Sequence, residues 1–214
     1  MSAANAPIPR VGILCLQGDY AAHGRVLDRL GCAWRDVRRA RDLDGLQGLV
    51  LPGGESTTMW YFLRRDGLDV ALSEFGRRGG ALLGTCAGAI LLATGVRNPT
   101  ANGLGLLDMD VERNSYGRQL ASRVAQATLT SGGTMEAVLI RAPRIVRCGA
   151  SLIVRATLDG DPAWVESGSI VATTFHPELA DETRVHARWL ELAAAAPAFF
   201  DSALMRREIA PTGA

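Results

Sequence analysis

The sequence ALLGTCAGAI, residues 81–90, places a single cysteine, Cys86, between two apolar runs, with Gly84 and Gly88 two residues to either side of it. This spacing fits the elbow in which a strand turns sharply into a helix and exposes a nucleophile. At a helix start, the helix dipole and free N–H groups favour the thiolate, the form of cysteine that attacks carbonyl carbon. A buried structural cysteine can show the same spacing, so the elbow alone leaves both interpretations open.

Strands and helices alternate around this elbow. Continuous apolar runs predict buried parallel strands, and apolar residues at helical spacing predict helices. In the first half we expect strands within 10–18, 32–39, 45–54 and 81–86, and helices within 19–31, 55–67, 68–79 and 87–95. We expect Asp19 to cap the first helix, Gly31 to end it, and Ser56 or Thr57 to open the second.

The second half is β-rich. Short apolar segments separated by Gly, Pro and Asp run from residue 104 to 177, and an amphipathic helix is predicted within 181–196, with Val185, Trp189 and Leu192 along one side. Together the halves predict an α/β fold, a flavodoxin-like three-layer sandwich with a mostly parallel central sheet and an added β-rich segment. We expect a single domain over 10–206, with flexible tails at 1–9 and 207–214.

Composition excludes several classes of partner. The 214 residues are 48% hydrophobic, with 23 basic and 22 acidic residues, so the net charge of +1 favours neither nucleic acid nor an anionic membrane. No apolar run approaches the roughly 20 residues that cross a bilayer, and no secretory leader is recognisable. The four cysteines lack CxxC spacing, which indicates reduced thiols and a cytoplasmic protein.

A base for Cys86 must come from three histidines. We interpret His23 and His186, on the first and last predicted helices, as ordinary surface or packing residues. His176 differs, because it ends a predicted strand in TTFHPEL, residues 173–179, and Pro177 excludes it from the helical region. In an extended chain Glu178 points the same way as His176 and can orient its ring, which gives a Cys86–His176–Glu178 triad.

The loop LPGGEST, residues 51–57, is a third candidate element. Gly53 and Gly54 follow a buried strand, so their backbone N–H groups can approach a ligand closely and form an oxyanion hole. A phosphate-binding loop is the competing function, but neither GxxxxGK[ST] nor GxGxxG occurs. A plain strand-to-helix turn remains the structural alternative.

At these residues the chain resembles the class I (triad) glutamine amidotransferases, through PGGEST, GTCAG and FHPE in this order. The segments GILCLQG (12–18), LPGGESTTM (51–59), GLGLLDMDVERNSYGRQ (103–119) and IRAP (140–143) are similar to the glutaminase subunits of pyridoxal 5'-phosphate (vitamin B6) synthase. The resemblance runs from Val11 to the closing helix. PGGESTTM and VERNSYGRQ are far more specific than the elbow.

The resemblance implies hydrolysis of L-glutamine to L-glutamate and ammonia through a γ-glutamyl thioester on Cys86, with His176 as proton carrier and Glu178 orienting it. It implies oxyanion donors at Gly53, Gly54 and Ala87. It also implies glutamine contacts at Gly54, Glu55, Ser56, Arg113, Ile140 and Arg141; arginine suits the α-carboxylate of the substrate. No metal and no cofactor are expected, because pyridoxal phosphate would be a product of the whole complex.

The family further implies a partner, a barrel-shaped synthase subunit that takes the ammonia in a hetero-oligomeric complex. Such glutaminases are weak until docked, which suggests that the Gly53–Gly54 peptide flips on binding. We expect the partner to face QGDYAAH (17–23) and NSYGRQ (114–119). The chain departs from the family at Ala22, where an acidic residue is usual, so the docking contacts and the stoichiometry stay open.

Two other classes compete with this function. A stand-alone cysteine hydrolase or protease on a similar sheet would share the elbow, but would need neither arginines for a free amino acid nor the ERNSYGRQ stretch. A catalytically dead interaction subunit would not need an intact Cys86, His176 and Glu178. Labelling of Cys86 by a glutamine-analogue alkylator, with and without glutamine, separates the three.

Overall fold

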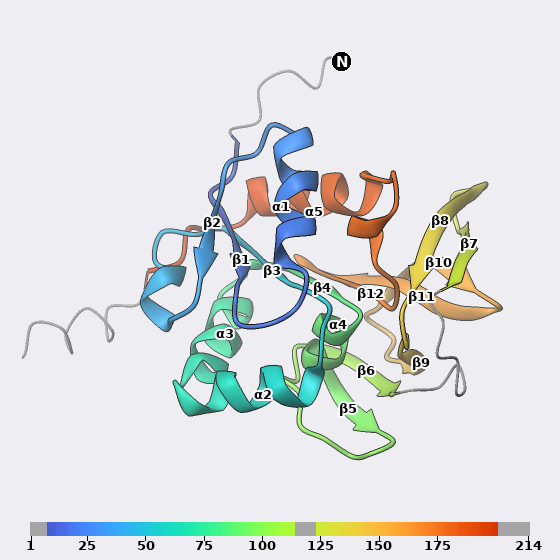
Figure 1. The fold of residues 1–214 in the computed structure, drawn as a ribbon, viewed down its shortest axis with the longest axis horizontal. Coiled ribbons are helices and arrows are strands. Elements are labelled where there is room, and N and C mark those ends of the chain that lie inside the picture. The colour runs from blue at the N-terminus through green and yellow to red at the C-terminus, as the bar shows by residue number, and fades with distance from the viewer. Residues whose placement is uncertain (1–7, 114–122, 201–214) are drawn as a thin grey trace, which may run out of the picture.

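The computed structural model describes residues 8–113 and 123–200. Its elements are shown in Figure 1. In chain order they are β1 (Val11–Leu14), α1 (Tyr20–Arg29), β2 (Trp34–Val37), η1 (Ala40–Leu43), β3 (Gly48–Leu51), α2 (Ser56–Arg65), α3 (Leu68–Arg77), β4 (Ala81–Thr85), α4 (Ala87–Leu92), β5 (Ala93–Arg97), β6 (Leu107–Glu112), β7 (Arg123–Leu129), β8 (Thr134–Leu139), β9 (Arg144–Cys148), β10 (Ile153–Leu158), β11 (Asp161–Ser167), β12 (Ile170–Thr173), η2 (Pro177–Leu179) and α5 (Arg184–Ala195).

One large mixed sheet organises the described residues, in the strand order β2-β1-β3-β4-β12-β11-β10-β7-β8. Neighbours from β2 to β12 pair in parallel, and those from β12 to β8 pair antiparallel. A smaller sheet, β5-β6-β9, lies beside it. The prediction of an α/β fold with a parallel core and an added β-rich segment is therefore confirmed.

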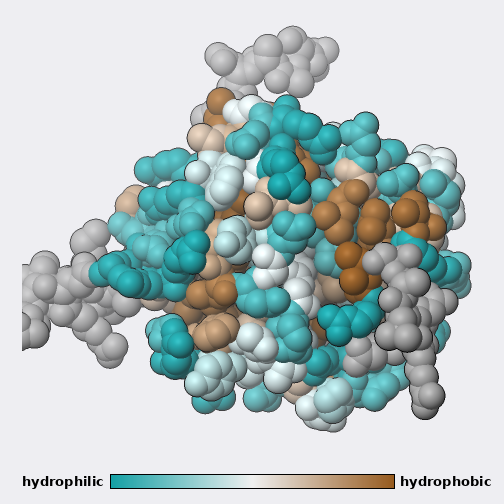
Figure 2. Space-filling model, viewed as in Figure 1, coloured by the Kyte–Doolittle hydropathy of each residue, from teal (hydrophilic) through white to brown (hydrophobic). Residues whose placement is uncertain are grey.

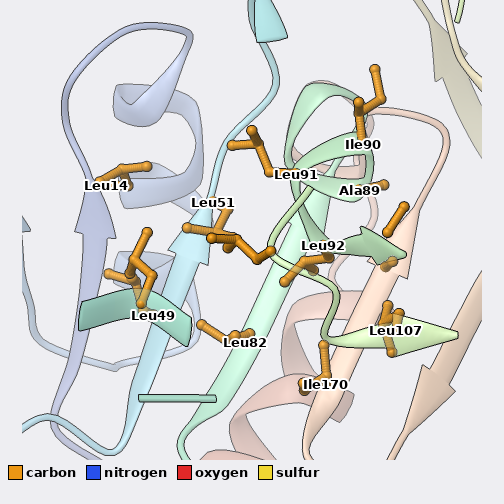
Figure 3. Packing of buried hydrophobic residues seen from close by; sticks show 14 of the residues in the cluster. Leu14, Leu49, Leu51, Leu82, Ala89, Ile90, Leu91, Leu92, Leu107 and Ile170 are labelled. Atoms are coloured by element: carbon orange, nitrogen blue, oxygen red, sulfur yellow. The ribbon is translucent and has the colours of Figure 1, made fainter. Parts of the chain in front are cut away.

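Helices cover both faces of the parallel core (Figure 1): α1 and α5 lie on one side, and α2, α3 and α4 on the other. The alternation of side chains along each strand divides the core accordingly. In β3, Leu49 and Leu51 join the cluster that includes α2, α3 and α4, whereas Val50 joins the cluster that includes α1 and α5. Figure 3 shows the first cluster, with Leu49 and Leu51 near Leu82 of β4 and Leu92 of α4. This is the three-layer arrangement predicted above.

The carboxyl ends of β1, β3, β4 and β12 meet at one edge of the sheet, because these strands are parallel. The loops that follow them carry Gln17, the Gly53–Gly54 turn, Cys86 and His176. The added strands reach the same edge, since the backbone N–H of His176 donates to Val138 O of β8 at 2.9 Å. This edge is where a site can form.

Two local predictions are wrong. The helix after Cys86 ends at Leu92, and residues 93–97 form β5, because Ala93 pairs with Leu107 and Thr94 Oγ1 donates to Leu107 O at 2.8 Å. Helix α2 is capped by Glu55 rather than by Ser56 or Thr57, because the longer carboxylate accepts the N–H groups of Thr57 and Thr58. The Asp19 cap and the left-handed Gly31 after α1 are confirmed.

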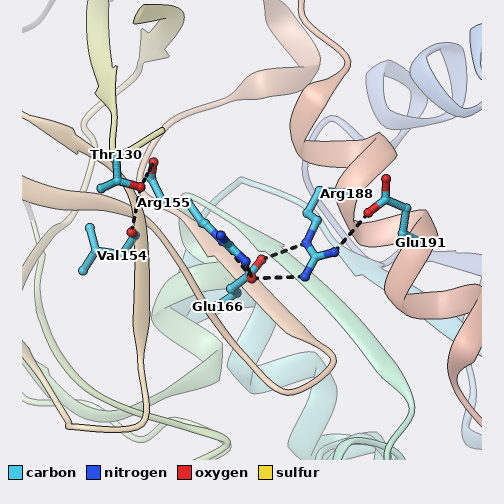
Figure 4. Close-up of polar contacts among 6 residues, drawn as sticks. All are labelled: Thr130, Val154, Arg155, Glu166, Arg188 and Glu191. Atoms are coloured by element: carbon cyan, nitrogen blue, oxygen red, sulfur yellow. Dashed lines mark hydrogen bonds and ion pairs between the residues drawn. The ribbon is translucent and has the colours of Figure 1, made fainter. Parts of the chain in front are cut away.

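The added strands are tied to the closing helix by a buried acid (Figure 4). Glu166 of β11, 2% exposed, accepts hydrogen bonds from Arg155 of β10 and from Arg188 of α5. Although burial raises the pKa of Glu166, the two guanidinium groups outweigh it and hold the pKa below its ordinary value. The carboxylate therefore joins β10, β11 and α5.

None of the helices in the described residues is both long and apolar enough to cross a membrane. All four cysteines are unpaired. The predicted domain limits of 10–206 and the tails at 1–9 and 207–214 stay predictions, because most of their end residues lie outside the described ranges.

Candidate active site

The elbow predicted at residues 84–88 is present. Cys86 directly follows β4 and precedes α4, and it has φ 50° and ψ −101°, a strained conformation for a residue with a side chain. A Cβ atom on Gly88 would lie 2.0 Å from Leu51 O of β3. Only glycine allows α4 to approach the neighbouring strand this closely, and that approach presents Cys86 at the sheet edge.

His176 and Glu178 form the predicted pair. Nδ1 of His176 and Oε1 of Glu178 are 2.7 Å apart, and both residues are buried at 6% exposure. The backbone of His176, at φ −104° and ψ 87°, lies outside the helical region, as Pro177 requires. Because Nδ1 is bound to the carboxylate, Nε2 is the ring nitrogen left for Cys86, and it makes no hydrogen bond within the described residues.

The interactions of this pair favour the protonated form of the His176 ring, an imidazolium. Burial lowers the pKa of His176, but interactions with Cys86 and Glu178 outweigh burial and raise it to about 10. For Glu178, burial raises the pKa, but the nearby His23 and His176 hold it well below its usual range. At neutral pH the site therefore contains a protonated His176 held by an ionised Glu178.

Cys86 and His176 line one open cavity of about 380 Å³. Cys86 is 6% exposed, so the sulfur reaches this cavity from a largely buried position. Glu178 lies behind the ring of His176. The other predicted oxyanion and substrate residues also line the cavity: Gly53, Gly54, Glu55, Ser56, Ala87, Arg113, Ile140 and Arg141.

The Gly53–Gly54 turn packs closely on two sides. A Cβ on Gly53 would lie 2.3 Å from Cε1 of His176, and a Cβ on Gly18 would lie 1.9 Å from Gly53 O. The carbonyl of Gly53 thus faces the loop after β1. Gln17 of that loop accepts the N–H of Glu55 at 2.8 Å, which fixes the far end of the turn.

Arg113 reaches the cavity from the end of β6. Its guanidinium donates to Thr57 Oγ1 at 3.1 Å and lies 3.6 Å from Glu55 Oε1. Glu55 therefore has two partners, the start of α2 and Arg113. Its hydrogen bonds to Thr58 and Thr57, opposed by slight burial, lower its pKa to about 2. A positively charged group stands at the cavity wall, next to a helix start.

Ile140 and Arg141 come from the added β-rich segment, directly after β8. The carbonyl oxygen of Ile140 lies 3.8 Å from Sγ of Cys86, as a weak thiol hydrogen bond. Arg141 is exposed and has φ 46°. The residues that follow the added strand β8 thus supply part of the cavity wall.

A family model, the SNO glutamine amidotransferase family, matches residues 13–194 of this chain. The chain belongs to the SNO glutamine amidotransferase family. The match spans the elbow, the Gly53–Gly54 turn and the His176–Glu178 pair. The geometry described above is thus that of a SNO-family chain.

Curated relatives agree with this family. The chain is 48% identical over 188 residues to the pyridoxal 5'-phosphate synthase subunit PdxT of Solibacter usitatus, covering 85% of this chain and 97% of the relative. It is 47% identical over 189 residues to the PdxT of Deinococcus radiodurans, covering 86% and 96%. These alignments cover almost the whole length of the relatives.

Solved structures agree as well. A crystal structure of a glutamine amidotransferase superposes with a TM-score of 0.81 at 42% identity, covering 86% of this chain and 98% of that one. PurLQS of Thermotoga maritima matches with a TM-score of 0.66 at 18% identity, covering 87% and 97%, which is a likeness of fold alone.

Of the surface or packing roles predicted for two histidines of this SNO-family chain, the structure bears out packing. His23 and His186 are both 0% exposed, and Nδ1 of His23 lies 2.9 Å from Nε2 of His186. The signal was available: His23 stands three residues before buried Val26, and His186 three before buried Trp189, so each shares the buried face of its helix. Sequence reasoning missed Gln17.

Other expectations concern the surface of this SNO-family chain. Ala22 is 0% exposed, so the side chain that departs from the usual acidic residue offers no docking surface here. The NSYGRQ segment, 114–119, lies outside the described residues. Within the described ranges, no group of three His, Cys, Asp or Glu side chains could hold a metal ion.

Proposed function

We propose that this chain is the glutaminase subunit of a pyridoxal 5'-phosphate synthase, which hydrolyses L-glutamine to L-glutamate and ammonia and delivers the ammonia to a barrel-shaped synthase subunit. The observation that carries the proposal is the 2.7 Å contact between His176 Nδ1 and Glu178 Oε1 behind a cavity that also contains Cys86. The curated relatives, which are named subunits of this synthase, support the choice of pathway.

The first half-reaction forms a thioester. The Cys86 thiolate attacks the side-chain carbonyl carbon of glutamine, and the carbonyl oxygen becomes an oxyanion. N–H groups of Gly53, Gly54 and Ala87 are the proposed donors to this oxyanion. The tetrahedral intermediate collapses as its C–N bond breaks, and Nε2–H of His176 protonates the departing nitrogen, which leaves as ammonia. The proton balance fits a His176 that starts protonated, as its raised pKa of about 10 implies.

The second half-reaction hydrolyses the thioester and regenerates the free enzyme. His176, now neutral, takes a proton from a water molecule, whose oxygen attacks the thioester carbon. The C–S bond then breaks, which releases glutamate and restores the Cys86 thiolate beside the His176 imidazolium. Glu178 stays ionised throughout and stabilises the imidazolium, as the acid of a triad does.

The amino-acid end of glutamine fits the far wall of the cavity. We assign the α-carboxylate to the arginine side of the cavity, where Arg113 and Arg141 supply positive charge. Gly54, Glu55, Ser56 and Ile140 are the other proposed contacts. The carboxylate of Glu55 lies 3.6 Å from Arg113, so it can orient this guanidinium as well as cap α2.

The proposed synthase partner docks over the cavity. Asp19, in the segment expected to face the partner, lines the cavity mouth. Apolar surface gathers on the viewed face near η2 and the β7–β8 hairpin (Figure 2). Leu179 of η2 and Val124 of β7, at 37% and 62% exposure, are among the exposed hydrophobic residues. Four unpaired cysteines fit a reducing compartment, and we propose that the complex works in the cytoplasm.

A glutamine-analogue alkylator tests the proposal. We expect a single adduct on Cys86, located by peptide mass spectrometry, and protection of Cys86 by L-glutamine, with the synthase subunit present. Cys32, buried and with its pKa raised by burial, is the internal control and should stay unlabelled. Labelling that glutamine does not slow would instead favour a cysteine hydrolase of another specificity, and no labelling would favour a catalytically dead subunit.

A further inference from the structure

A buried pair of histidines lies directly behind the proposed triad. His23 of α1 and His186 of α5 come from the two helices on one face of the sheet (Figure 1). Both are 0% exposed, and the 2.9 Å contact between His23 Nδ1 and His186 Nε2 joins the two helices. The two half-reactions above use neither ring.

The other ring nitrogen of His23, Nε2, lies close to the carboxylate of Glu178. Nε2 of His23 is 3.3 Å from Oε1 of Glu178 and 3.2 Å from Oγ1 of Thr85. The same Oε1 atom accepts the Nδ1–H of His176 at 2.7 Å. One carboxylate oxygen therefore contacts the rings of both His23 and His176, and Thr85, which directly precedes Cys86, contacts the ring of His23.

The protons in this line can be assigned. Glu178 is ionised and so acts only as an acceptor, and the 3.3 Å contact of its Oε1 with Nε2 of His23 is favourable when Nε2 carries the proton. Burial and the nearby His23 lower the pKa of His186 to about 3, so His186 is neutral at working pH. A neutral His186 can donate Nε2–H to Nδ1 of His23. Its own Nδ1, which makes no hydrogen bond within the described residues, then carries a lone pair rather than a buried proton.

The orientation of Glu178 depends on the two histidines. Its second oxygen, Oε2, is buried and makes no hydrogen bond among the described residues. Without His23, the Nδ1–H of His176 would be the one hydrogen-bond donor left to Glu178 among the described residues, and the carboxylate could rotate more freely. A buried carboxylate with fewer donors is also harder to keep ionised.

We propose that His23 is a positioning residue for the glutaminase reaction: it holds Oε1 of Glu178 together with His176, and His186 fixes the tautomer of His23. The working unit is then the line Cys86–His176–Glu178–His23. This inference rests on the proposed function, since its role is defined by the glutaminase chemistry of Cys86 and His176.

Two substitutions of His23 separate positioning from packing. His23→Met keeps an unbranched side chain of similar length but removes the N–H donor. His23→Gln places an amide N–H close to where Nε2 of the imidazole lies, so it can still donate to Glu178. Leu27→Met is the matched control, because Leu27 is fully buried in the same helix and has no polar side-chain group.

The main measurement is glutamine hydrolysis by the complex with the synthase subunit, as kcat and KM across pH. For His23→Met we expect kcat to fall about tenfold or more, with KM within about twofold, because misplacing a catalytic group costs rate rather than binding. The acidic limb of the profile should move to higher pH, as Glu178 becomes easier to protonate. His23→Gln should restore most of kcat and most of the original position of the acidic limb. Leu27→Met should match the unaltered chain in both measurements.

The titratable groups that face His23 are Glu178 from η2 and His186 from α5, with His176 beyond Glu178 and Arg29 of α1 acting on His186. A shift of the acidic limb of the pH profile therefore reports a change in the line Cys86–His176–Glu178–His23. The alkylation rate of Cys86 by iodoacetamide against pH, in the uncomplexed chain, gives a second measurement that needs no turnover. His23→Met should slow the alkylation of Cys86 at the acidic end of the pH range, and His23→Gln should not.

Equal loss in His23→Met and His23→Gln, or no loss in either, would overturn the proposal, since both results mean that the donor does not matter. Should the unaltered complex release no ammonia, the proposed function would fail, and the alkylation profile would still decide whether His23 acts on Cys86 through Glu178 and His176.

Discussion

Cys86 has a backbone conformation, φ 50° and ψ −101°, that a residue with a side chain adopts only when its surroundings impose it. The surroundings here are close backbone contacts. Gly88 lies against Leu51 O of β3, and the N–H of Cys86 donates to Thr173 O of β12 at 2.9 Å. The nucleophile is thus held between the two strands that also lead to the Gly53–Gly54 turn and to His176.

Gly88→Ala should therefore damage both stability and chemistry. Its Cβ would meet Leu51 O at 2.0 Å, and β3 and α4 would have to separate. We expect a loss of about 3 kcal/mol in the free energy of unfolding, measured with urea, and little glutaminase activity. Gly31→Ala is the control: its Cβ meets nothing within 4 Å at φ +68°, so it should cost about 1 kcal/mol and leave activity intact. Equal effects of the two changes would contradict this account of the elbow.

His176 gives a prediction with a defined sign. Its folded-state pKa of about 10 lies above the ordinary 6.5, so protonation stabilises the folded chain. This contribution is complete below about pH 6.5 and is lost as the pH rises toward 10. The advantage of the unaltered chain over His176→Gln in urea unfolding should therefore shrink by about 2 kcal/mol or more between pH 6 and pH 9.5. An advantage that does not change with pH would contradict the imidazolium assignment.

At the scale of elements, the short turn η2 and the strand β8 contribute residues to the site that forms at the carboxyl ends of the parallel strands. The N–H of His176 donates to Val138 O, and the Ile140 carbonyl lies over Sγ of Cys86. The added antiparallel strands are thus part of the site as well as an extension of the sheet. Their anchorage to α5 through Glu166 keeps this wall of the cavity in place.

Glu166→Gln tests that anchorage. The change leaves Arg155 and Arg188 facing a neutral amide in a buried position, so we expect a loss of about 2 kcal/mol in the free energy of unfolding at pH 7. Both guanidinium groups are partly exposed to solvent, which limits the loss. Glu191→Gln, which removes an exposed partner of the same Arg188, should change stability by less than about 0.5 kcal/mol. Comparable losses in the two variants would contradict the buried-acid interpretation.

The same elements show what the sequence could predict. Cys86 and His176 each follow a buried apolar run, and the carboxyl ends of parallel strands meet at one edge, so their convergence followed from pattern alone. The cap of α2 could not be predicted, because Ser56, Thr57 and Glu55 can all accept N–H groups. The His23–His186 contact depends on how α1 and α5 pack across a long sequence separation, and no local pattern encodes that packing.

At the scale of the whole molecule, the cavity takes residues from the first and second halves of the chain alike. The Gly53–Gly54 turn is the part of the cavity wall with the widest range of accessible backbone conformations, because both residues are glycines and Gly54 has φ +154°. A partner that docks at the cavity mouth can therefore act on the proposed oxyanion donors without disturbing the sheet.

Glutaminase turnover should accordingly depend on assembly. We expect the rate of glutamate formation to be low for the chain alone and to rise at least tenfold with the synthase subunit, because we propose that docking rearranges the turn so that its N–H groups stabilise the oxyanion. Gly54→Ala should remove most of this increase, while binding to the synthase, measured by sedimentation, persists. Equal rates with and without the partner would rule out this gating.

The most direct test of the Cys86–His176–Glu178 chemistry is ammonia release from L-glutamine by the assembled complex, compared with the same complex that contains Cys86→Ala. We predict one ammonia for each glutamate formed, and a loss of about a thousandfold or more in the variant, because its methyl group cannot attack the carboxamide. Ammonia release by the Cys86→Ala complex at the unaltered rate would contradict the account.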